Sequence, residues 1–268
     1  MAYEILRQML AESRKIMVLS GMGMIRESGI SYFRDEPYAY QIEARYGYSP
    51  EDFLSAAFYA SRPGSFYKFY KEEVLKLRYD AKPNVAHKAL ARLEQQKEAE
   101  GGRVAIATRS ISGLHQKAGC KNVIELCGNL FRNTCARCGK KFPPEFIMQS
   151  KGIPHCDKCQ SAIRPGILLA GEMLDNGLVT RVAEETETAD MLLVVGTHLD
   201  AYMTKRFRQY YTGDRLVLIT DEHHPTDYEA NLVIYERVSD VLPKVILEVS
   251  RQENKTDKKQ ENDHCADR

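Results

Sequence analysis

Four cysteines are spaced as two pairs that can hold one metal ion. Cys135 and Cys138 form a C-x2-C pair, and Cys156 and Cys159 form a second pair after seventeen intervening residues. Each C-x2-C turn presents two thiolates on one side of the chain, and two such turns complete the tetrahedral four-cysteine shell of a zinc ribbon. With all four positions filled by protein, we expect a structural zinc with no open position for water. An iron–sulfur cluster is the weaker alternative, because two cysteine pairs separated by a long loop suit a zinc ribbon better.

A glycine-containing stretch near the amino terminus has residue types that suit phosphate binding. The segment VLSGMGMIRESGISYFR, residues 18–34, begins as an apolar strand and runs into Gly21 and Gly23. Glycines at the end of a strand let backbone amides approach a phosphate at the start of the next helix. A G-x-G pattern alone also fits a strand-ending turn without a ligand, so this motif leaves both interpretations open.

Another candidate is Cys127, a lone cysteine in the stretch ELCG, directly before Gly128. A thiol has an ordinary pKa of about 8.5 and is mostly protonated near neutral pH, unless a cation or a helix amino terminus lowers that pKa. Cys127 therefore carries chemistry only in a suitable electrostatic setting. The alternative is an inert, half-buried thiol.

These residues need a framework that brings them together, and the pattern of the chain predicts an α/β fold. Short apolar runs such as KIMVLS, GRVAIAT, DMLLVVGT and DRLVLIT are typical of buried strands. Helical stretches such as YEILRQMLAESR, AHKALARLEQQ and VTRVAEETETA alternate with them. This alternation predicts a parallel sheet with helices on both faces.

Two segments interrupt the alternation and are candidates for one lobe outside the sheet. Residues 35–80 are rich in Tyr, Phe, Lys and Glu and are expected to form a helical insertion, while residues 132–163 carry the paired cysteines. The stretches 1–34, 81–131 and 164–249 then form the sheet domain. The tail 250–268 has almost nothing to bury and is expected to be disordered.

Composition and charge exclude several classes of protein. Of 268 residues, 43% are hydrophobic and 28% charged, and the net charge of +1 gives no global attraction to nucleic acid or an anionic membrane. No apolar run approaches the roughly 20 residues that span a bilayer, and the amino terminus lacks the layout of a signal peptide. The seven cysteines fit thiols or metal ligands better than disulfides. We therefore expect a cytoplasmic protein with no nucleic-acid or membrane partner.

Several motifs in a fixed order resemble those of the sirtuin (silent information regulator) family of NAD-dependent protein deacylases. The likeness extends over about residues 5–245. After the glycine segment and the four cysteines already described, the motifs that carry it are PNVAHKAL at 83–90, TRSISGLH at 108–115, IELCG at 124–128, RPGILLAGE at 164–172 and VVGTHL at 194–199.

The resemblance implies a Rossmann-like parallel sheet with helices on both faces, plus a small lobe made of a four-cysteine zinc ribbon and the helical insertion. It also implies a cleft between them where NAD meets an acyl-lysine peptide. In the family, the nicotinamide–ribose bond breaks, the ADP-ribosyl group passes to the acyl oxygen, and a histidine acts as base. The positions it assigns to the nucleotide are Gly21, Gly23, Ser28, Phe33, Arg34, Arg109, Ser110, Gly196, Thr197 and Asp221.

The chain departs from the usual family motifs at positions that bear on nucleotide chemistry. Met22 replaces an alanine at a backbone–pyrophosphate contact and adds three heavy side-chain atoms there. Ser110 replaces the asparagine that positions the ribose and its water, and Ser112 replaces the aspartate that holds the nicotinamide amide. Serine is shorter than either residue and neutral, so it fills neither role easily.

Cys127 stands where the family has its catalytic histidine. Histidine suits general-base catalysis because its ordinary pKa of about 6.5 lies near working pH, whereas Cys127 needs a cation such as Arg109 to lower the pKa of its thiol. Three functions remain open: a weakened or inactive sirtuin homologue that binds NAD, ADP-ribose or another nucleotide; an active deacylase or ADP-ribosyltransferase acting on a protein or acyl-lysine substrate; and an interaction module that has lost its ligand.

Overall fold

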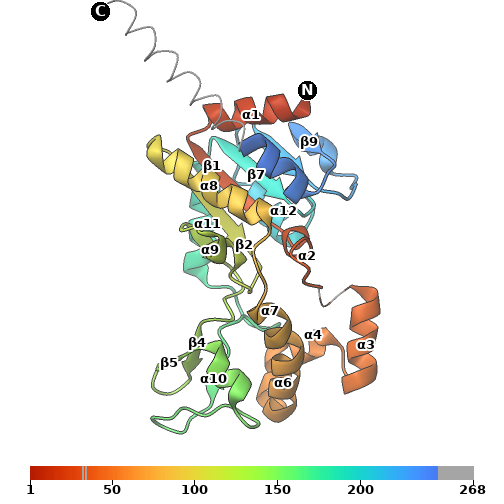
Figure 1. Ribbon diagram of the computed structural model, residues 1–268, viewed down its shortest axis with the longest axis vertical. Helices are drawn as coiled ribbons and strands as arrows, with labels where there is room; N and C mark the ends of the chain where they lie inside the picture. Colours follow the sequence, from red (N-terminus) through yellow and green to blue (C-terminus); the bar gives the residue numbers. More distant parts are fainter. Residues whose placement is uncertain (32, 34, 247–268) are drawn as a thin grey trace, which may run out of the picture.

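The computed structural model describes residues 1–31, 33 and 35–246 (Figure 1). Two predictions fall outside these residues, namely the nucleotide contact of Arg34 and the disorder of the tail 250–268. Within the described residues the chain has two parts, one above the other in Figure 1. The upper part contains the large sheet and the lower part contains the paired cysteines.

The large sheet has six strands, all parallel, in the order β3-β2-β1-β7-β8-β9. Its strands are β1 (Lys15–Ser20), β2 (Arg103–Thr108), β3 (Val123–Glu125), β7 (Met191–Val195), β8 (Leu216–Ile219) and β9 (Leu232–Ile234). The four apolar runs singled out in the sequence are the four central strands. The expected α/β fold with a parallel sheet is therefore confirmed.

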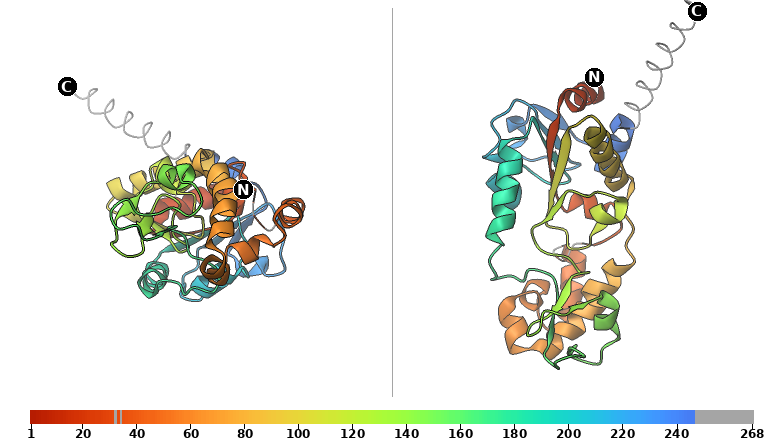
Figure 2. Two further views of the ribbon diagram at one scale, coloured as in Figure 1. Left: turned by 90° about the horizontal axis from the view of Figure 1, so that it is seen from below. Right: turned by 90° about the vertical axis from the view of Figure 1, so that its left-hand side faces the viewer.

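Both faces of this sheet are buried because successive side chains of a strand point to opposite faces. Ile16 and Val18 of β1 belong to one hydrophobic core, and Met17 and Leu19 belong to another. The first core is closed by α1 (Ala2–Glu12), α8 (Val85–Ala99) and a helix at 238–246, and the second by α11 (Asn176–Glu187) and α12 (Tyr202–Arg208). Figure 2 shows α11 and α8 on opposite sides of the strands.

Short helices lie in the connections of the sheet part. They are α2 (Gly23–Arg26), which directly follows β1, α9 (Leu114–Ala118), which follows β2, and η2 (Asp227–Glu229) between β8 and β9. Among the residues described, no helix is both long and apolar enough to cross a bilayer.

The lower part combines a helical segment with a small antiparallel sheet. The helices are α3 (Glu36–Tyr46), α4 (Pro50–Phe53), α5 (Ala56–Ser61), α6 (Pro63–Phe69), the π-helix η1 (Tyr70–Leu75), α7 (Lys76–Tyr79) and α10 (Pro144–Gln149). The strands β4 (Asn133–Cys135), β5 (Lys141–Phe142) and β6 (Ile163–Arg164) pair in the order β5-β4-β6. Buried residues of both segments, such as Phe69 and Ile163, share one hydrophobic core.

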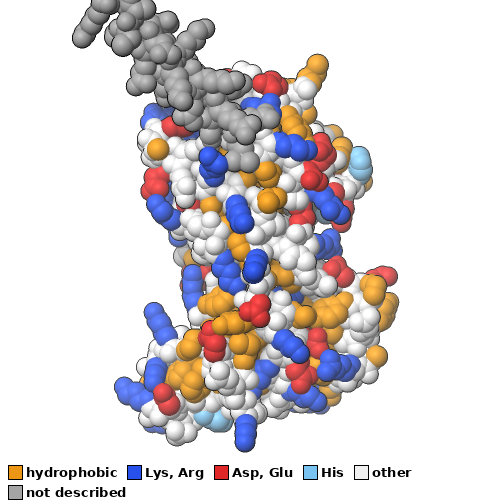
Figure 3. Space-filling view, in the orientation of Figure 1, with side chains coloured by type: hydrophobic (Ala, Val, Ile, Leu, Met, Phe, Trp, Pro, Cys, Tyr) orange, Lys and Arg blue, Asp and Glu red, His pale blue; other side chains and the backbone are white. Residues whose placement is uncertain are grey.

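Strand order reverses between β1 and β7, since the chain runs outward from β1 to β3 on one side and from β7 to β9 on the other. In open parallel sheets, ligands bind beyond the carboxyl ends of the strands at such a switch point. These ends face the lower part (Figure 1), and the outline of the molecule narrows between the two parts (Figure 3). Acidic and basic side chains are interspersed over the face drawn in Figure 3, in keeping with the net charge near zero.

Candidate functional site

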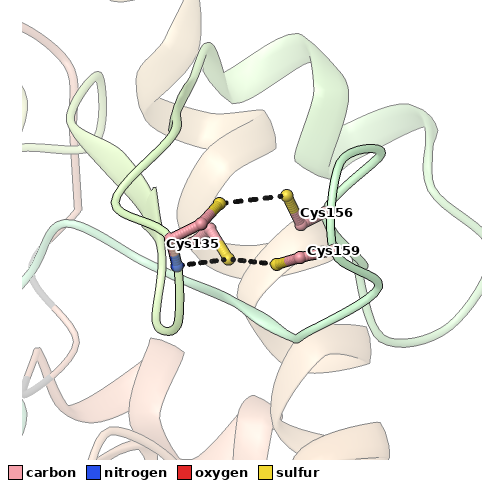
Figure 4. A group of neighbouring side chains, drawn as sticks. Cys135, Cys156 and Cys159 are labelled. Carbon is pink, nitrogen blue, oxygen red and sulfur yellow. Dashed lines mark hydrogen bonds between the residues drawn. The ribbon is translucent and has the colours of Figure 1, made fainter.

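The four paired cysteines converge on one point of the lower part. The sulfur atoms of Cys135, Cys138, Cys156 and Cys159 all lie within 4.8 Å of one another. Cys135 Sγ is 3.4 Å from Cys159 Sγ, and Cys138 Sγ is 3.6 Å from Cys156 Sγ. Figure 4 shows the labelled sulfur atoms turned toward the centre of the cluster. Four thiolates with this spacing fit the tetrahedral coordination of zinc and leave no position for a water.

The two turns that carry these cysteines have the same backbone geometry. The residue after each pair, Gly139 in the first turn and Gln160 in the second, has a left-handed backbone with φ of 69° and 61°. The amide of Gly139 donates to the carbonyl of Cys135 at 3.1 Å, and the amide of Gln160 donates to that of Cys156 at 2.9 Å. A left-handed backbone costs a non-glycine residue free energy, so Gln160 is held there by the turn.

A cavity of about 260 Å³ opens at the switch point of the large sheet. Its wall includes six of the ten residues predicted to hold a nucleotide: Gly21, Gly23, Arg109, Gly196, Thr197 and Asp221. They come from the loops after β1, β2, β7 and β8, whose carboxyl ends meet at this edge. We call this the first cavity. Its position is the one that parallel sheets offer to a nucleotide.

Gly21, Gly23 and Gly196 are required by the close approach of two backbones. A Cβ atom on Gly21 would lie 2.4 Å from the carbonyl oxygen of Gly196, and one on Gly23 would lie 2.8 Å from the Gly196 Cα. The amide of Gly21 donates to the carbonyl of Val195 at 2.9 Å, and the amide of Gly23 donates to that of Gly196 at 2.8 Å. Both amides are thus engaged, and the glycines bring the loops after β1 and β7 into direct contact.

Charged side chains form one rim of the first cavity. Glu222 is 3.3 Å from Arg26 Nη1 and 3.0 Å from His198 Nε2, and all three line the cavity. Arg26 also pairs with Asp35 at 2.7 Å. Asp221 lies beside Glu222 in the same wall, and a carboxylate there can accept a hydrogen bond from a ribose hydroxyl.

A second cavity, of about 300 Å³, lies between the large sheet and the lower part. Met22 and Arg109 line both cavities, so these two side chains stand between them. The second cavity is lined by Ser110, Ser112 and Cys127, the three positions at which the sequence analysis predicts altered catalytic motifs. The structure therefore brings these three residues, which are scattered over eighteen positions of the chain, to one surface.

Cys127 is half-buried and sits in a sharply turning segment. Its carbonyl accepts from the amide of Leu168 at 2.9 Å. Gly128 has φ of 77°, and a Cβ atom there would lie 2.2 Å from the carbonyl oxygen of Gly166. The backbone of residues 166–168 thus fixes the position of Cys127 in the cavity wall.

A buried carboxylate, that of Glu125, stabilises the turn that contains Cys127. Glu125, which ends β3, is 5% exposed and lies 2.7 Å from Arg132, and one of its oxygens accepts from the Asn129 side chain at 2.5 Å. Burial raises the pKa of Glu125, while Arg132 and Asn129 act in the opposite direction. Glu125 holds the turn and is absent from the residues that line either cavity.

The remaining predicted residues are divided between these surfaces. Phe33 lines the second cavity and not the first. Ser28 lines neither, and its hydroxyl donates to the carbonyl of Met24 at 3.5 Å. The sequence analysis did not identify Arg78, which lines the second cavity and is 3% exposed. Nothing in the stretch EEVLKLRYD distinguishes it from a solvated helix position.

Comparisons with known proteins agree with this architecture. Residues 21–202 match the model of the Sir2 family. The chain is 39% identical over 242 residues to the NAD-dependent protein deacetylase of Clostridium acetobutylicum, which covers 90% of this chain and 96% of that protein. It is 38% identical over 245 residues to the NAD-dependent protein deacetylase of Clostridium tetani, with 91% and 97% covered.

Solved structures show the same likeness over the whole fold. A structure of Sir2 bound to acetylated peptide matches with a TM-score of 0.77 at 32% identity, covering 93% of this chain and 99% of that one. A Sir2–p53 peptide–NAD+ structure matches with a TM-score of 0.75 at 33% identity, again covering 93% and 99%. Since the family model spans more than half of the chain and the relatives align over nearly their full length, the chain belongs to the Sir2, or sirtuin, family.

Proposed function

We propose that this sirtuin binds NAD or ADP-ribose in the first cavity and is weakened or inactive as a deacetylase. Support for binding comes from the place of the first cavity at the switch point, beyond the carboxyl ends of β1 and β7. It also comes from the structural likeness to a Sir2–p53 peptide–NAD+ complex. Asp221 would accept from a ribose hydroxyl, and Arg26 and Arg109 would face the negative charge of the diphosphate.

The observation that carries the loss of deacetylation is the shared position of Ser110, Ser112 and Cys127 in one cavity wall. The family resemblance assigns these positions to orientation of the ribose, contact with the leaving nicotinamide and the general base, so all three functions are altered at one reacting carbon. A positioned general base alone contributes about 10²–10⁴-fold to a rate. No single neighbour replaces three such contributions.

The position of Met22 favours ADP-ribose as an alternative ligand to NAD. Its side chain stands in the wall of both cavities, where a dinucleotide reaching from one to the other would pass. ADP-ribose lacks the nicotinamide and needs less of the second cavity. Thioether side chains are flexible, so Met22 would weaken NAD binding without forbidding it.

The four-cysteine cluster would hold a structural zinc, and we propose that it stabilises a small lobe made of residues 35–80 and 132–163. The shared hydrophobic core of these segments supports that division, with 1–34, 81–131 and 164–249 as the sheet domain. The near-neutral composition favours a cytoplasmic protein without nucleic-acid or membrane partners.

An active enzyme is the second candidate. Two relatives, 39% and 38% identical to this chain, are named NAD-dependent protein deacetylases, which favours a deacylase. Transfer of ADP-ribose to a protein is the other reaction open to an active enzyme whose site lacks the histidine. In that case Arg109 and Cys127, which line the same cavity wall, would both face the reacting groups. A module without any ligand is the third candidate, favoured by the engaged amides of Gly21 and Gly23.

Isothermal titration with NAD and with ADP-ribose tests the binding half of the proposal. We expect micromolar binding of at least one nucleotide and tighter binding of ADP-ribose than of NAD. Met22→Ala should strengthen NAD binding more than ADP-ribose binding, whereas Met173→Ala, which changes an exposed methionine outside both cavities, should alter neither. If neither nucleotide binds, the chain is the ligand-free module.

A further inference from the structure

The cysteine module, residues 132–163, carries an excess of positive charge. It contains six Lys and Arg residues against two acids, a net charge of +4, so the other residues of the chain together carry −3. All six of these cations are exposed. Figure 3 shows basic side chains projecting at the lower left, where Figure 1 places β5. Such a charge asymmetry along a chain indicates a surface for an anionic partner.

Two of these cations occupy matching places in the two cysteine turns. Arg137 directly precedes the second cysteine of the first pair, and Lys158 precedes that of the second pair. Because the four sulfur atoms lie within 4.8 Å of one another, the two turns stand side by side. Lys140 connects them, since its Nζ lies 2.6 Å from an oxygen of Asp157. We call Arg137, Lys140, Lys141 and Lys158 the basic patch.

Three of the four cations in the basic patch have no acid. They form no ion pair with any residue that the structure describes, whereas Lys140 pairs with Asp157. Glu145, the other acid of the module, accepts from the Tyr79 hydroxyl. Both acids of the module are therefore engaged, and three positive charges remain available to a partner.

The cysteines alone do not account for these charges. Four thiolates on a zinc ion would leave two negative charges in excess, whereas the module has four positive charges in excess. Backbone amides already approach the sulfurs. The Cys138 amide lies 3.5 Å from Cys135 Sγ, and the Lys158 amide lies 3.4 Å from Cys156 Sγ. The module therefore stays positive with its metal bound.

The surroundings favour a short polypeptide over a nucleic acid or a membrane. None of the large hydrophobic side chains that are exposed in the described structure belongs to residues 132–163. The module thus offers no aromatic platform for bases and no apolar wedge for a bilayer. The rest of the chain, with its net charge of −3, would repel an extended polyanion. A short run of carboxylates meets the basic patch alone.

We propose that the basic patch is a docking surface for a short acidic segment of a partner protein, a run of Asp and Glu residues. Its carboxylates would form charge-assisted hydrogen bonds with Arg137, Lys141 and Lys158. Exposed ion pairs contribute little each, so the contact is salt-sensitive and of moderate affinity. This surface goes beyond the proposed function and does not depend on a nucleotide in the first cavity.

Fluorescence anisotropy of labelled octaglutamate, titrated with the full zinc-loaded chain, tests the proposal. We expect binding at low ionic strength that weakens as salt is added, and much weaker binding of labelled octaglutamine. Equal binding of the two peptides would overturn the proposal. A single-stranded DNA of the same charge is the third probe. If it binds more tightly than octaglutamate, the surface serves nucleic acid and the proposal is wrong.

A matched pair of double variants locates the binding. Arg137→Glu with Lys158→Glu should weaken octaglutamate binding at least about tenfold. Arg92→Glu with Lys88→Glu makes the same change of net charge at two exposed cations of α8 and should weaken it far less. Equal effects of the two double variants would show that net charge alone drives binding, which contradicts a docking surface on the module.

Zinc content and thermal unfolding show whether the charge-reversed module folds. If it does not, Arg137→Gln with Lys158→Gln takes its place, because glutamine keeps the backbone donors of both turns and removes only the charges. We then expect a severalfold loss of octaglutamate binding. Unchanged binding by this variant would refute the proposal.

Discussion

At the scale of single residues, the proposed loss of deacetylation rests on three positions of the second cavity. Ser110 and Ser112 are 7% and 1% exposed, and with half-buried Cys127 they line one cavity. Short hydroxyls and a thiol leave this wall less polar than the amide, carboxylate and imidazole that the family motif would supply. Restoring only the amide, the carboxylate or the imidazole leaves the other two groups missing, so we expect the three positions to act together.

A triple variant tests this interpretation directly. Ser110→Asn, Ser112→Asp and Cys127→His together should raise the rate of nicotinamide release from NAD in the presence of an acetyl-lysine peptide by about 10²-fold or more. Each single substitution should give much less. Release measured by chromatography under saturating NAD provides the comparison, and a triple variant no faster than the wild type would refute the role given to these positions.

Residue types and motif order pointed to several side chains that line the two cavities, but they predicted neither burial nor contacts. Gly21, Arg109 and Cys127 lie in cavity walls, as the motifs indicate. Ser28 instead bonds to the carbonyl of Met24, one turn back in its own chain. Arg78 escaped notice because its burial depends on contacts between its helix and Ser31 and Phe33, which no local pattern encodes.

At the scale of elements, the two cysteine turns are near copies that differ at one backbone-sensitive position. Gly139 has nothing within 4 Å of the place where a Cβ atom would lie, so only its left-handed backbone restricts the residue type there. Gln160 adopts the same conformation with a side chain. The left-handed backbone therefore suits Gly139 in the first turn and is unfavourable for Gln160 in the second.

Exchanging residues between the turns should have opposite effects. Gln160→Gly should raise the free energy of unfolding by about 0.5–1 kcal/mol, and Gly139→Gln should lower it by about 1 kcal/mol. Urea denaturation of the zinc-loaded protein measures both. Destabilisation by Gln160→Gly would show that its side chain contributes more than its backbone conformation costs.

Zinc should be needed for the cysteine module and dispensable for the large sheet. Cys135 and Cys156 are buried in the core that unites the lower part, whereas β1, β2, β7 and β8 pack in separate cores. A chelator should abolish hydrogen-exchange protection over 133–163 and leave these strands protected. Cys138→Ser should mimic chelation and Cys127→Ser should not, because Cys127 is outside the cluster. Retained protection over 133–163 would contradict a structural zinc.

The central strands were predictable from the sequence and the edge strands were not. Runs such as MLLVV are apolar throughout because both faces of a central parallel strand are covered. The edge strands β3 and β9 have only three residues each, and neither Val123 nor Leu232 is fully buried. Such short runs are indistinguishable from a loop until the neighbouring strand supplies hydrogen-bond partners.

At the scale of the whole molecule, two buried histidines link the stability of the sheet part to pH. His115 Nε2 lies 3.0 Å from the Ser20 hydroxyl, His87 Nδ1 lies 2.8 Å from Asn84 Oδ1, and the two rings are 4.7 Å apart. Burial lowers the pKa of His87 to about 4, and burial together with the neighbouring His87 lowers that of His115 to about 3. Both side chains are therefore neutral in the folded protein at pH 7.

Acid should destabilise the fold through these histidines. In the unfolded chain they have ordinary pKa values of about 6.5, so between about pH 6.5 and 4 the unfolded state binds more protons and the free energy of unfolding falls as the pH falls. For His87 the loss is on the order of 2–3 kcal/mol. Urea midpoints across this range should show a shallower pH dependence for His87→Gln. The exposed His223→Gln should match the wild type, and equal slopes for all three proteins would contradict the assignment.

At the scale of the whole molecule, the two cavities are separate surfaces. The first cavity depends on loop contacts such as those of Gly21 and Gly196, whereas the second is lined by Ser110, Ser112 and Cys127. Under the proposed function, the nucleotide would bind in the first cavity and the altered chemistry would lie in the second. Sequence motifs indicated the family and one cleft between the two parts, but two cavities that share Met22 and Arg109 in their walls were visible only in the folded chain.

Nicotinamide release from NAD, measured with and without an acetyl-lysine peptide at saturating NAD, separates an inactive nucleotide binder from a working deacylase. We expect the wild-type protein to bind the nucleotide and yet to show no peptide-dependent release above background. Release that requires the peptide and disappears in Cys127→Ala would contradict it, because Cys127 would then be a working catalytic residue.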